Sequence, residues 1–362
     1  MSNNNISNGI DPQNNNNRPM PKHTSLGTSK VVLISALVFF FITLAAVFPM
    51  MLSGADKTVI IRIPQNATMT DIKDTLKKYT GDSYTSRILR LMKIRNVDMT
   101  RRHGQFEIEK GDSPFTAMRK LTSGGQHPVS ITINGFRDSN QMAERIARKL
   151  ELTPQELIEA MNDSATLAPY NLEPGQALAL FLNDTYSVYW TATPKELIEK
   201  IGNNYTSVWN TFRRKLASDL NLTPLQVTIL ASIVDEETNK RSEKGTIARL
   251  YLNRLARGMK LQSDPTVRFA LQDFTIKRVL EKHLEVNSPF NTYKNFGLPP
   301  APIRTTSVET IDAILKSEPN DYLYMCARED FSGFHNFAST YEEHLKNAKK
   351  YHQTLNEKDI LQ

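Results

Sequence analysis

Residues 229–240 read ILASIVDEETNK, and this stretch decides how we interpret the rest of the chain. An apolar run leads directly into three consecutive acids at 235–237. The residues TPLQ at 223–226 combine a capping threonine, a proline at the first helical position and a glutamine at the third. The sequence therefore predicts a helix over 225–238 that carries the three acids at its C-terminal end.

The phase of this helix separates the three acids. Side chains three and four positions apart share a helix face, so Glu237 should lie over Ile233 and Val234 and have more apolar neighbours than Asp235 or Glu236. Desolvation raises the pKa of a carboxyl group, and a carboxyl group that stays protonated near neutral pH can act as a general acid. We predict that Glu237 is a catalytic acid. The alternative is that all three acids form the solvated end of a buried helix.

Further motifs follow this helix in a fixed order. They are NRL at 253–255, GM at 258–259, LQSDPT at 261–266, NTY at 291–293, GLPP at 297–300 and HNF at 335–337. Together with the acidic helix, this order and spacing resemble the endolytic murein transglycosylase family, also called YceG-like, over more than 100 residues. The second glutamate of the family's E-x-E motif is catalytic, and its counterpart is Glu237. The chain departs from the pattern at Asp235, Phe290 and Ala301, none of which is the catalytic position.

The resemblance implies a peptidoglycan substrate and a reaction that needs one carboxyl group. Glu237 would protonate the glycosidic oxygen between MurNAc and GlcNAc, and the same group, now a base, would accept the proton of the sugar's own C6 hydroxyl. That hydroxyl attacks C1 and closes a 1,6-anhydro ring, so proximity supplies much of the rate. Asp235 lies about 200° round the helix at 3.6 residues per turn, so it should not face the same bond.

The resemblance also implies which polar side chains surround the sugars. We expect them to be Gln262, Asp264, Asn291, Tyr293 and His335. Simpler readings are that Asp264 caps a turn, that His335 is a hydrogen-bonded loop histidine and that Tyr293 belongs to the core. The segment ending in Asn183-Asp184-Thr185-Tyr186 is similar to a cleft-lining motif of the family, which adds Asp184 and Tyr186. A turn cap is the favoured alternative for Asp184.

One apolar segment is long enough to cross a membrane. Val31 to Leu52 contains 22 residues without a charge, and about 20 apolar residues span a hydrocarbon core of about 30 Å. The segment is long for a signal-peptide core, so we predict a retained single-pass anchor; a buried soluble helix is the alternative. Residues 1–30, rich in Asn and Ser, should form a disordered tail. The resemblance implies that this tail is cytoplasmic and that the body lies outside the inner (plasma) membrane, near peptidoglycan synthases.

Composition excludes several other classes of protein. The net charge of +7 and the isoelectric point near 9.2 suit an anionic cell envelope, while no nucleic-acid-binding motif is present. The single cysteine, Cys326, excludes an internal disulfide and lies in an apolar run typical of a core strand. The seven histidines show no metal-ligand spacing, and no glycine-rich phosphate loop occurs, so we expect neither a metal nor a cofactor.

The predicted fold class is α+β. After the anchor at 31–52 we expect a small LysM-like α/β subdomain at 57–125, a connecting α/β region at 126–190 and a mostly helical catalytic domain with a few strands at 191–355. LysM modules bind glycans, although this unit could equally be a spacer. A helix capped by Thr193 should run to about Asp219, and the proline-rich loop at 297–302 should lie at the cleft.

Two rival functions remain open. A membrane-anchored scaffold that binds peptidoglycan or its synthesis machinery without cutting it would need no acid on an apolar helix face, so Glu237 discriminates against it. A hydrolase would use water as the nucleophile, and its products would be heavier by one water than anhydro products.

Overall fold

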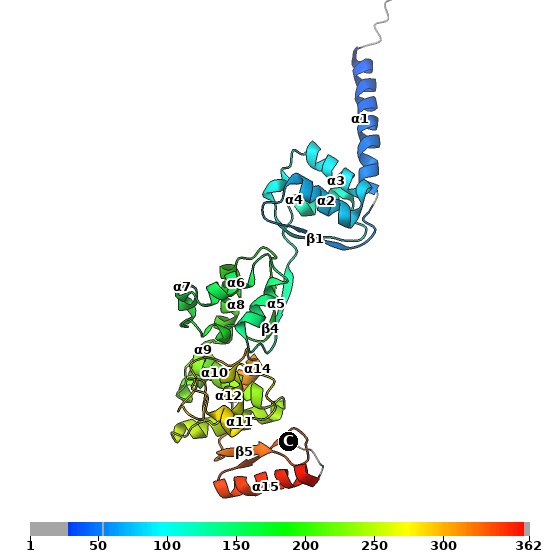
Figure 1. The fold of residues 1–362 in the computed structure, drawn as a ribbon. Coiled ribbons are helices and arrows are strands. Elements are labelled where there is room, and N and C mark those ends of the chain that lie inside the picture. Colours follow the sequence, from blue (N-terminus) through cyan, green and yellow to red (C-terminus); the bar gives the residue numbers. More distant parts are fainter. Residues whose placement is uncertain (1–27, 53, 358–362) are drawn as a thin grey trace, which may run out of the picture.

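The computed structural model describes residues 28–52 and 54–357, so most of the predicted tail at 1–30 lies outside the described residues. It is a helix-rich α+β fold in which the described part of the chain forms three two-stranded antiparallel sheets. The molecule is elongated, and its parts follow one another in chain order from helix α1 at one end to helix α15 at the other (Figure 1). The predicted mixture of helices and a few strands is confirmed.

Helix α1 (Thr28–Leu52) covers the apolar segment near the N-terminus. Several large apolar side chains along it are exposed, including Phe39, Phe41 and Ile42. Across the two described ranges, no helix meets the combined requirement of length and hydrophobicity for crossing a membrane. The membrane anchor therefore stays a prediction.

The next unit is built on strand β1 (Val59–Ile63), which pairs with β2 (Gly104–Ile108) so that Ile61 lies opposite Phe106. Its helices are α2 (Met69–Thr80), α3 (Asp82–Ile94) and α4 (Pro114–Thr122), with a short 3₁₀ turn at Met99–Arg101. Its buried residues, from Ala55 to Leu121, form a hydrophobic cluster of their own.

The Gly-Asp-Ser turn of this unit closes by local hydrogen bonds. Gly111 has φ +89°, which favours glycine. The Asp112 carboxylate accepts from the backbone of Glu109 and from Lys120, while Ser113 caps α4. The sequence therefore specifies the sharp passage from strand to helix.

A second sheet, β3 (Val129–Ile133) with β4 (Asp184–Val188), lies beyond this unit. Between the two strands run α5 (Ser139–Ala147), α6 (Pro154–Met161), α7 (Ser164–Leu167) and two 3₁₀ turns at Ala168–Tyr170 and Ala177–Ala179. Helix α8 (Pro194–Val208) follows and begins at the predicted Thr193 capping box.

The predicted helix from 194 to about 219 is wrong in one respect, because it is two helices. Trp209 ends α8 with φ −81° and ψ 56°, and its ring is buried in the core. The side chain of Asn210 then accepts from the backbone of Arg213 and starts α9 (Thr211–Asp219). The burial of the Trp209 ring and the capping by Asn210 therefore end one helix and start another, although the sequence pattern is helical throughout.

The last part of the chain surrounds helix α10 (Pro224–Glu237). It contains α11 (Arg241–Ala256), α12 (Asp264–Leu271), α13 (Glu281–Leu284), α14 (Val308–Leu315), the sheet of β5 (Tyr324–Ala327) and β6 (His335–Ala338), and α15 (Tyr341–Glu357). Nine consecutive residues of α10, 227–235, are buried, so this helix has almost no solvent face. One hydrophobic core runs from Val129 to Leu315 and holds α10 at its centre.

Candidate active site

The three acids at the end of α10 point to three different environments. The helix begins with the predicted capping box, in which Thr223 and Gln226 bond each other's backbone amides, and it ends because Thr238 is extended. Asp235 and Glu236 are each met by basic side chains, whereas the described residues offer Glu237 no ion-pair partner.

Asp235 belongs to a buried polar cluster. One carboxylate oxygen accepts from Lys244 Nζ at 2.7 Å and Thr310 Oγ1 at 2.6 Å, and the other accepts from Thr306 Oγ1 at 2.5 Å. These partners come from α11, α14 and the loop before α14, so Asp235 joins three elements and does not face the cavity described below.

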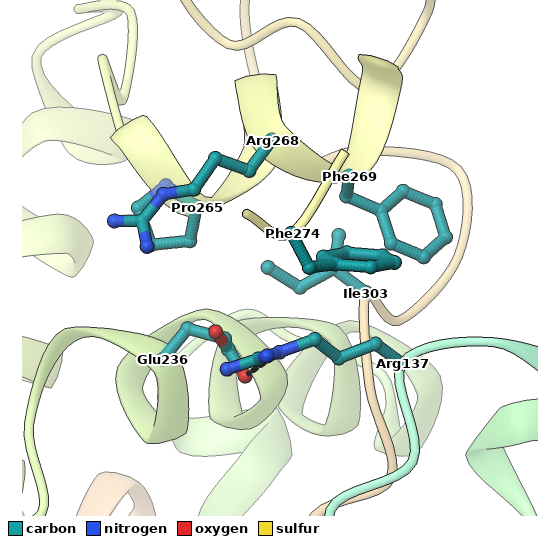
Figure 2. A pocket seen from close by; sticks show the side chains of 7 residues that line it. All are labelled: Arg137, Glu236, Pro265, Arg268, Phe269, Phe274 and Ile303. Carbon is teal, nitrogen blue, oxygen red and sulfur yellow. Dashed lines mark hydrogen bonds and ion pairs between the residues drawn. The ribbon is translucent and has the colours of Figure 1, made fainter. Parts of the chain in front are cut away.

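Glu236 turns toward the middle of the molecule. Its Oε1 accepts from Arg137 Nε and from Arg304, each at 2.7 Å, and its side chain is only 7 % exposed. Figure 2 shows Glu236 paired with Arg137, whose guanidinium also lies 5.5 Å from the ring centroid of Phe274. This acid therefore joins the β3–α5 loop to the end of α10.

Glu237 is held by two hydroxyl groups. Tyr251 Oη donates to its Oε1 at 2.6 Å, and Ser263 Oγ donates to the same oxygen at 2.7 Å. No hydrogen bond to Oε2 is found among the described residues. Burial raises the pKa of Glu237, while the bonds from Tyr251 and Ser263 partly oppose that rise. Burial and the adjacent Glu237 raise the pKa of Tyr251 far above its usual value, so Tyr251 stays a donor. Since Oε1 accepts both of these hydrogen bonds, Oε2 is the oxygen available to carry a proton.

A cavity of about 430 Å³ opens beside Glu237. Its walls come from the ends of α10 and α12, from α11 and from the sheet of β5 and β6. Of the predicted site residues, it brings together Glu237, Gln262, Asp264, Tyr293 and His335. Cys326 also lines it and is only half-buried, so the prediction of a strand is confirmed but that of a core thiol is wrong.

Two hydrogen-bonded pairs of side chains line this cavity. Tyr293 Oη donates to Asp264 Oδ1 at 2.6 Å, and burial together with this carboxylate raises the pKa of Tyr293. Gln262 has φ +53°, and its Oε1 accepts from Arg254 at 3.2 Å. Asp264 starts helix α12, where the sequence predicted only a polar segment.

His335 enters the cavity from β6 and is oriented by Glu243. Its Nδ1 lies 3.1 Å from Glu243 Oε2, and its backbone amide donates to Glu243 Oε1 at 2.8 Å. Glu243 is buried on α11. Because Nδ1 faces this carboxylate, Nε2 is the ring nitrogen left for the cavity.

Three predicted site residues do not line the cavity. Asn291 is fully buried, and its Nδ2 donates to the carbonyls of Leu284 and Val286 while its Oδ1 accepts from the Tyr293 amide. It therefore supports the loop that carries Tyr293. Tyr186 is buried and bonds the Leu182 carbonyl, and Asp184 is an exposed residue at the start of β4.

Three residues that contact the site were not predicted from the sequence: Tyr251, Ser263 and Glu243. Tyr251 lies in the apolar run LYLNRL and is indistinguishable there from a core tyrosine. Ser263 lies inside the LQSDPT motif, so the motif itself was the available signal. Across the two described ranges, no group of three or more His, Cys, Asp or Glu residues could hold a metal ion.

A protein with one proton-carrying acid at the end of a buried helix, open to a polar cavity, has the equipment of an acid catalyst. Residues 61–350 match the sequence model of the YceG-like family, and the chain belongs to this family. The resemblance inferred from the motifs is thus confirmed.

Curated relatives and a solved structure agree with this assignment. The chain is 28 % identical over 319 residues to the endolytic murein transglycosylase of Bacillus subtilis, covering 83 % of this chain and 87 % of the relative. It is 25 % identical over 337 residues to the enzyme of the same name from Streptococcus pneumoniae, covering 83 % of this chain but only 59 % of that longer protein. A YceG-like protein of Listeria monocytogenes, known from a 2.6 Å crystal structure, has a TM-score of 0.54 at 26 % identity, with 80 % of this chain and 98 % of that one covered.

Proposed function

We propose that this protein is a lytic transglycosylase that cleaves peptidoglycan strands internally, between MurNAc and GlcNAc, and leaves a 1,6-anhydroMurNAc end. The observation that carries the proposal is the asymmetry of Glu237, whose Oε1 is saturated by Tyr251 and Ser263 while Oε2 is left to donate. The names of the curated relatives support the same activity.

The reaction balances without water. Glu237 Oε2 gives its proton to the glycosidic oxygen as the bond from that oxygen to C1 of MurNAc breaks. The C6 hydroxyl of the same sugar attacks C1, and its proton returns to Glu237. Tyr251 and Ser263 keep Oε1 an acceptor throughout, so one oxygen serves both proton transfers.

The test is a digest of purified, uncrosslinked glycan strands, analysed by mass spectrometry. We expect internal cleavage with anhydro termini. Glu237→Gln should lower the rate by about 10²- to 10⁴-fold, the usual contribution of a general acid, with an unchanged melting curve. Glu159→Gln, an exposed acid on α6, is the matched control and should cut normally. Products heavier by one water would show a hydrolase, with Asp264 as the candidate base, and a fully active Glu237→Gln variant would refute the role of Glu237.

We further propose that α1 anchors the protein in the inner membrane, with the N-terminus in the cytoplasm and the body outside, beside peptidoglycan synthases that deliver nascent strands. Support comes from the uncharged run Val31 to Leu52 and from its exposed apolar side chains. In this position the enzyme would terminate glycan elongation.

The LysM-like unit is proposed to help hold the strand. A groove of about 740 Å³ lies between this unit and the middle region, and it is lined by Gln65 and His103 of the unit and by Gln126 and the half-exposed Tyr189 of the middle region. Aromatic rings stack on the apolar faces of sugars. Tyr189→Ala in a Glu237→Gln background should weaken strand binding several-fold, measured by fluorescence anisotropy; unchanged binding would leave the groove without a role in holding the strand.

A further inference from the structure

The cavity beside Glu237 contains two arginines with opposite surroundings. Arg254 is buried and donates to the carbonyls of Leu323, Lys260 and Leu261 and to the side chain of Gln262. Arg268, on α12, has no hydrogen bond or ion pair from its guanidinium to any of the described residues, and its Nε is buried without a partner. The first arginine is structural, and the second has unused donors.

The acids that line the same two pockets as Arg268 have hydrogen-bond partners other than Arg268. Glu236 is taken by Arg137 and Arg304, Asp264 accepts from Tyr293, and Glu237 accepts from Tyr251 and Ser263. Only the Nε of Arg268 is buried, and the side chain as a whole is partly exposed, so its guanidinium can donate to an anion that enters the cavity.

Arg268 lines both the cavity beside Glu237 and a second pocket. The side chain forms the wall between the catalytic cavity and a small adjoining pocket lined by Glu236 and two phenylalanines. Figure 2 shows it extending across Pro265, on the opposite side of that pocket from the Glu236–Arg137 pair. A guanidinium offers a planar fork of donors that matches a carboxylate in two parallel hydrogen bonds.

We propose that Arg268 binds a carboxylate carried on the 3-O-lactyl group of the muramyl residue at the cleavage site. This inference rests on the proposed function, since it assigns the part of peptidoglycan that the cavity recognises. Two sources share this chemistry: the lactyl carboxylate itself in strands without peptides, and an acidic residue of the stem peptide in strands that carry them. Arg268 is a specificity residue in either case, because it acts away from the reacting bond.

Three substrates separate these sources. They are strands with intact stem peptides, strands stripped by an amidase to free the lactyl carboxylate, and stripped strands whose carboxyl groups are capped as methylamides. Loss of a hydrogen-bonded charge pair should raise KM for Arg268→Gln by about tenfold or more on a carboxylate-bearing strand, with kcat little changed. The capped strand should be cut by this variant and by the wild type at similar rates. Arg268→Lys should fall between, since lysine keeps the charge but loses the fork.

The matched control is Arg249→Gln. Arg249, on α11, also has a buried Nε without a partner, but it does not line the cavity and bonds the Ser317 carbonyl. It should leave discrimination among the three strands unchanged. Melting curves of all variants separate a folding defect from a binding defect.

The outcomes are distinct. A loss confined to peptide-bearing strands assigns the stem peptide, and a loss confined to stripped strands assigns the lactyl carboxylate. Equal effects on all three strands, or no effect on any, would overturn the inference. If the wild-type protein cuts no strand, the proposed function fails instead. Whether Arg268 selects a carboxylate is then decided by measuring how the Glu237→Gln variant and the Glu237→Gln, Arg268→Gln double variant bind the same three strands.

Discussion

At the scale of single residues, Glu237 differs from its two acidic neighbours because the described residues give it no ion-pair partner. The helical phase predicted that Glu237 has the most apolar neighbours, but α10 is buried on every side through residue 235, so apolar contact does not separate the three acids. Asp235 meets Lys244, and Glu236 meets Arg137 and Arg304. These basic partners come from distant parts of the chain and could not be predicted from the sequence. The prediction of Glu237 therefore depended on the helix phase, which was only partly correct, and on the family motif.

The hydroxyl of Tyr251 opposes the effect of burial on the pKa of Glu237. Burial raises the pKa of Glu237 and the Tyr251 hydrogen bond lowers it, so Tyr251→Phe should raise this pKa further. The reaction starts from the protonated acid. The alkaline limb of kcat/KM should therefore lie above the usual glutamate range in the wild type and move to still higher pH in Tyr251→Phe.

Initial rates on soluble strands from mildly acidic to mildly alkaline pH measure this shift. Ser263→Ala is the parallel variant, because it removes the other donor to Oε1 and should move the limb in the same direction. The raised pKa also means that the folded state holds this proton more tightly than the unfolded state. Its contribution to stability is therefore present at acidic pH and is lost as pH rises through the folded pKa. A limb that stayed in place or moved to lower pH would show that another group donates the proton.

At the scale of helices and strands, local capping signals predicted where helices begin. The capping boxes at Thr193 and Thr223 both form. The break at Trp209 was not predicted, because it depends on a ring that packs into the core. Helix α12 was not predicted either, because it depends on contacts of its first residues with Tyr293 and Thr292. Local hydrogen bonds are visible in a sequence, whereas contacts between remote segments are not.

The carboxylate of Asp235 holds three of these elements together. Asp235→Ala would leave the buried Lys244 ammonium without its counter-charge, so we expect a loss of about 3–5 kcal/mol in the free energy of unfolding. Denaturant unfolding followed by circular dichroism measures it. The double variant Asp235→Ala with Lys244→Met removes both charges and should recover much of that loss. If the double variant were as unstable as the single one, the ion pair would not be the source of the stability.

At the scale of the whole molecule, the unit of β1 and β2, the middle region and the last part of the chain follow one another along the molecule (Figure 1). The core that begins at Val129 continues through α10 to α14, so the middle region and the site share one interior. The expected boundary near 190 lies just before the helix that Thr193 caps, but a capping signal marks only where a helix begins and says nothing of whether the core continues. The proposed boundaries at 125 and 190 stay predictions.

The short link after α1 would confine the proposed enzyme to the membrane surface. Helix α1 ends at Leu52 and β1 begins at Val59, and the six intervening residues span at most about 20 Å when extended. A body held this close would meet nascent strands while they are still attached to their lipid. Replacing α1 by a cleaved signal peptide should leave activity on soluble strands within about twofold, because the site lies far along the molecule from α1. In cells that lack the gene, however, the same variant should fail to restore normal strand length. Chromatographic analysis of glycan length in those cells is the measurement.

The control variant carries about 30 additional flexible residues after Leu52, which keeps the anchor and lets the body move further from the membrane. It separates the effect of being anchored from the effect of being held close to the membrane. Full restoration by the freed body would show that the anchor is dispensable.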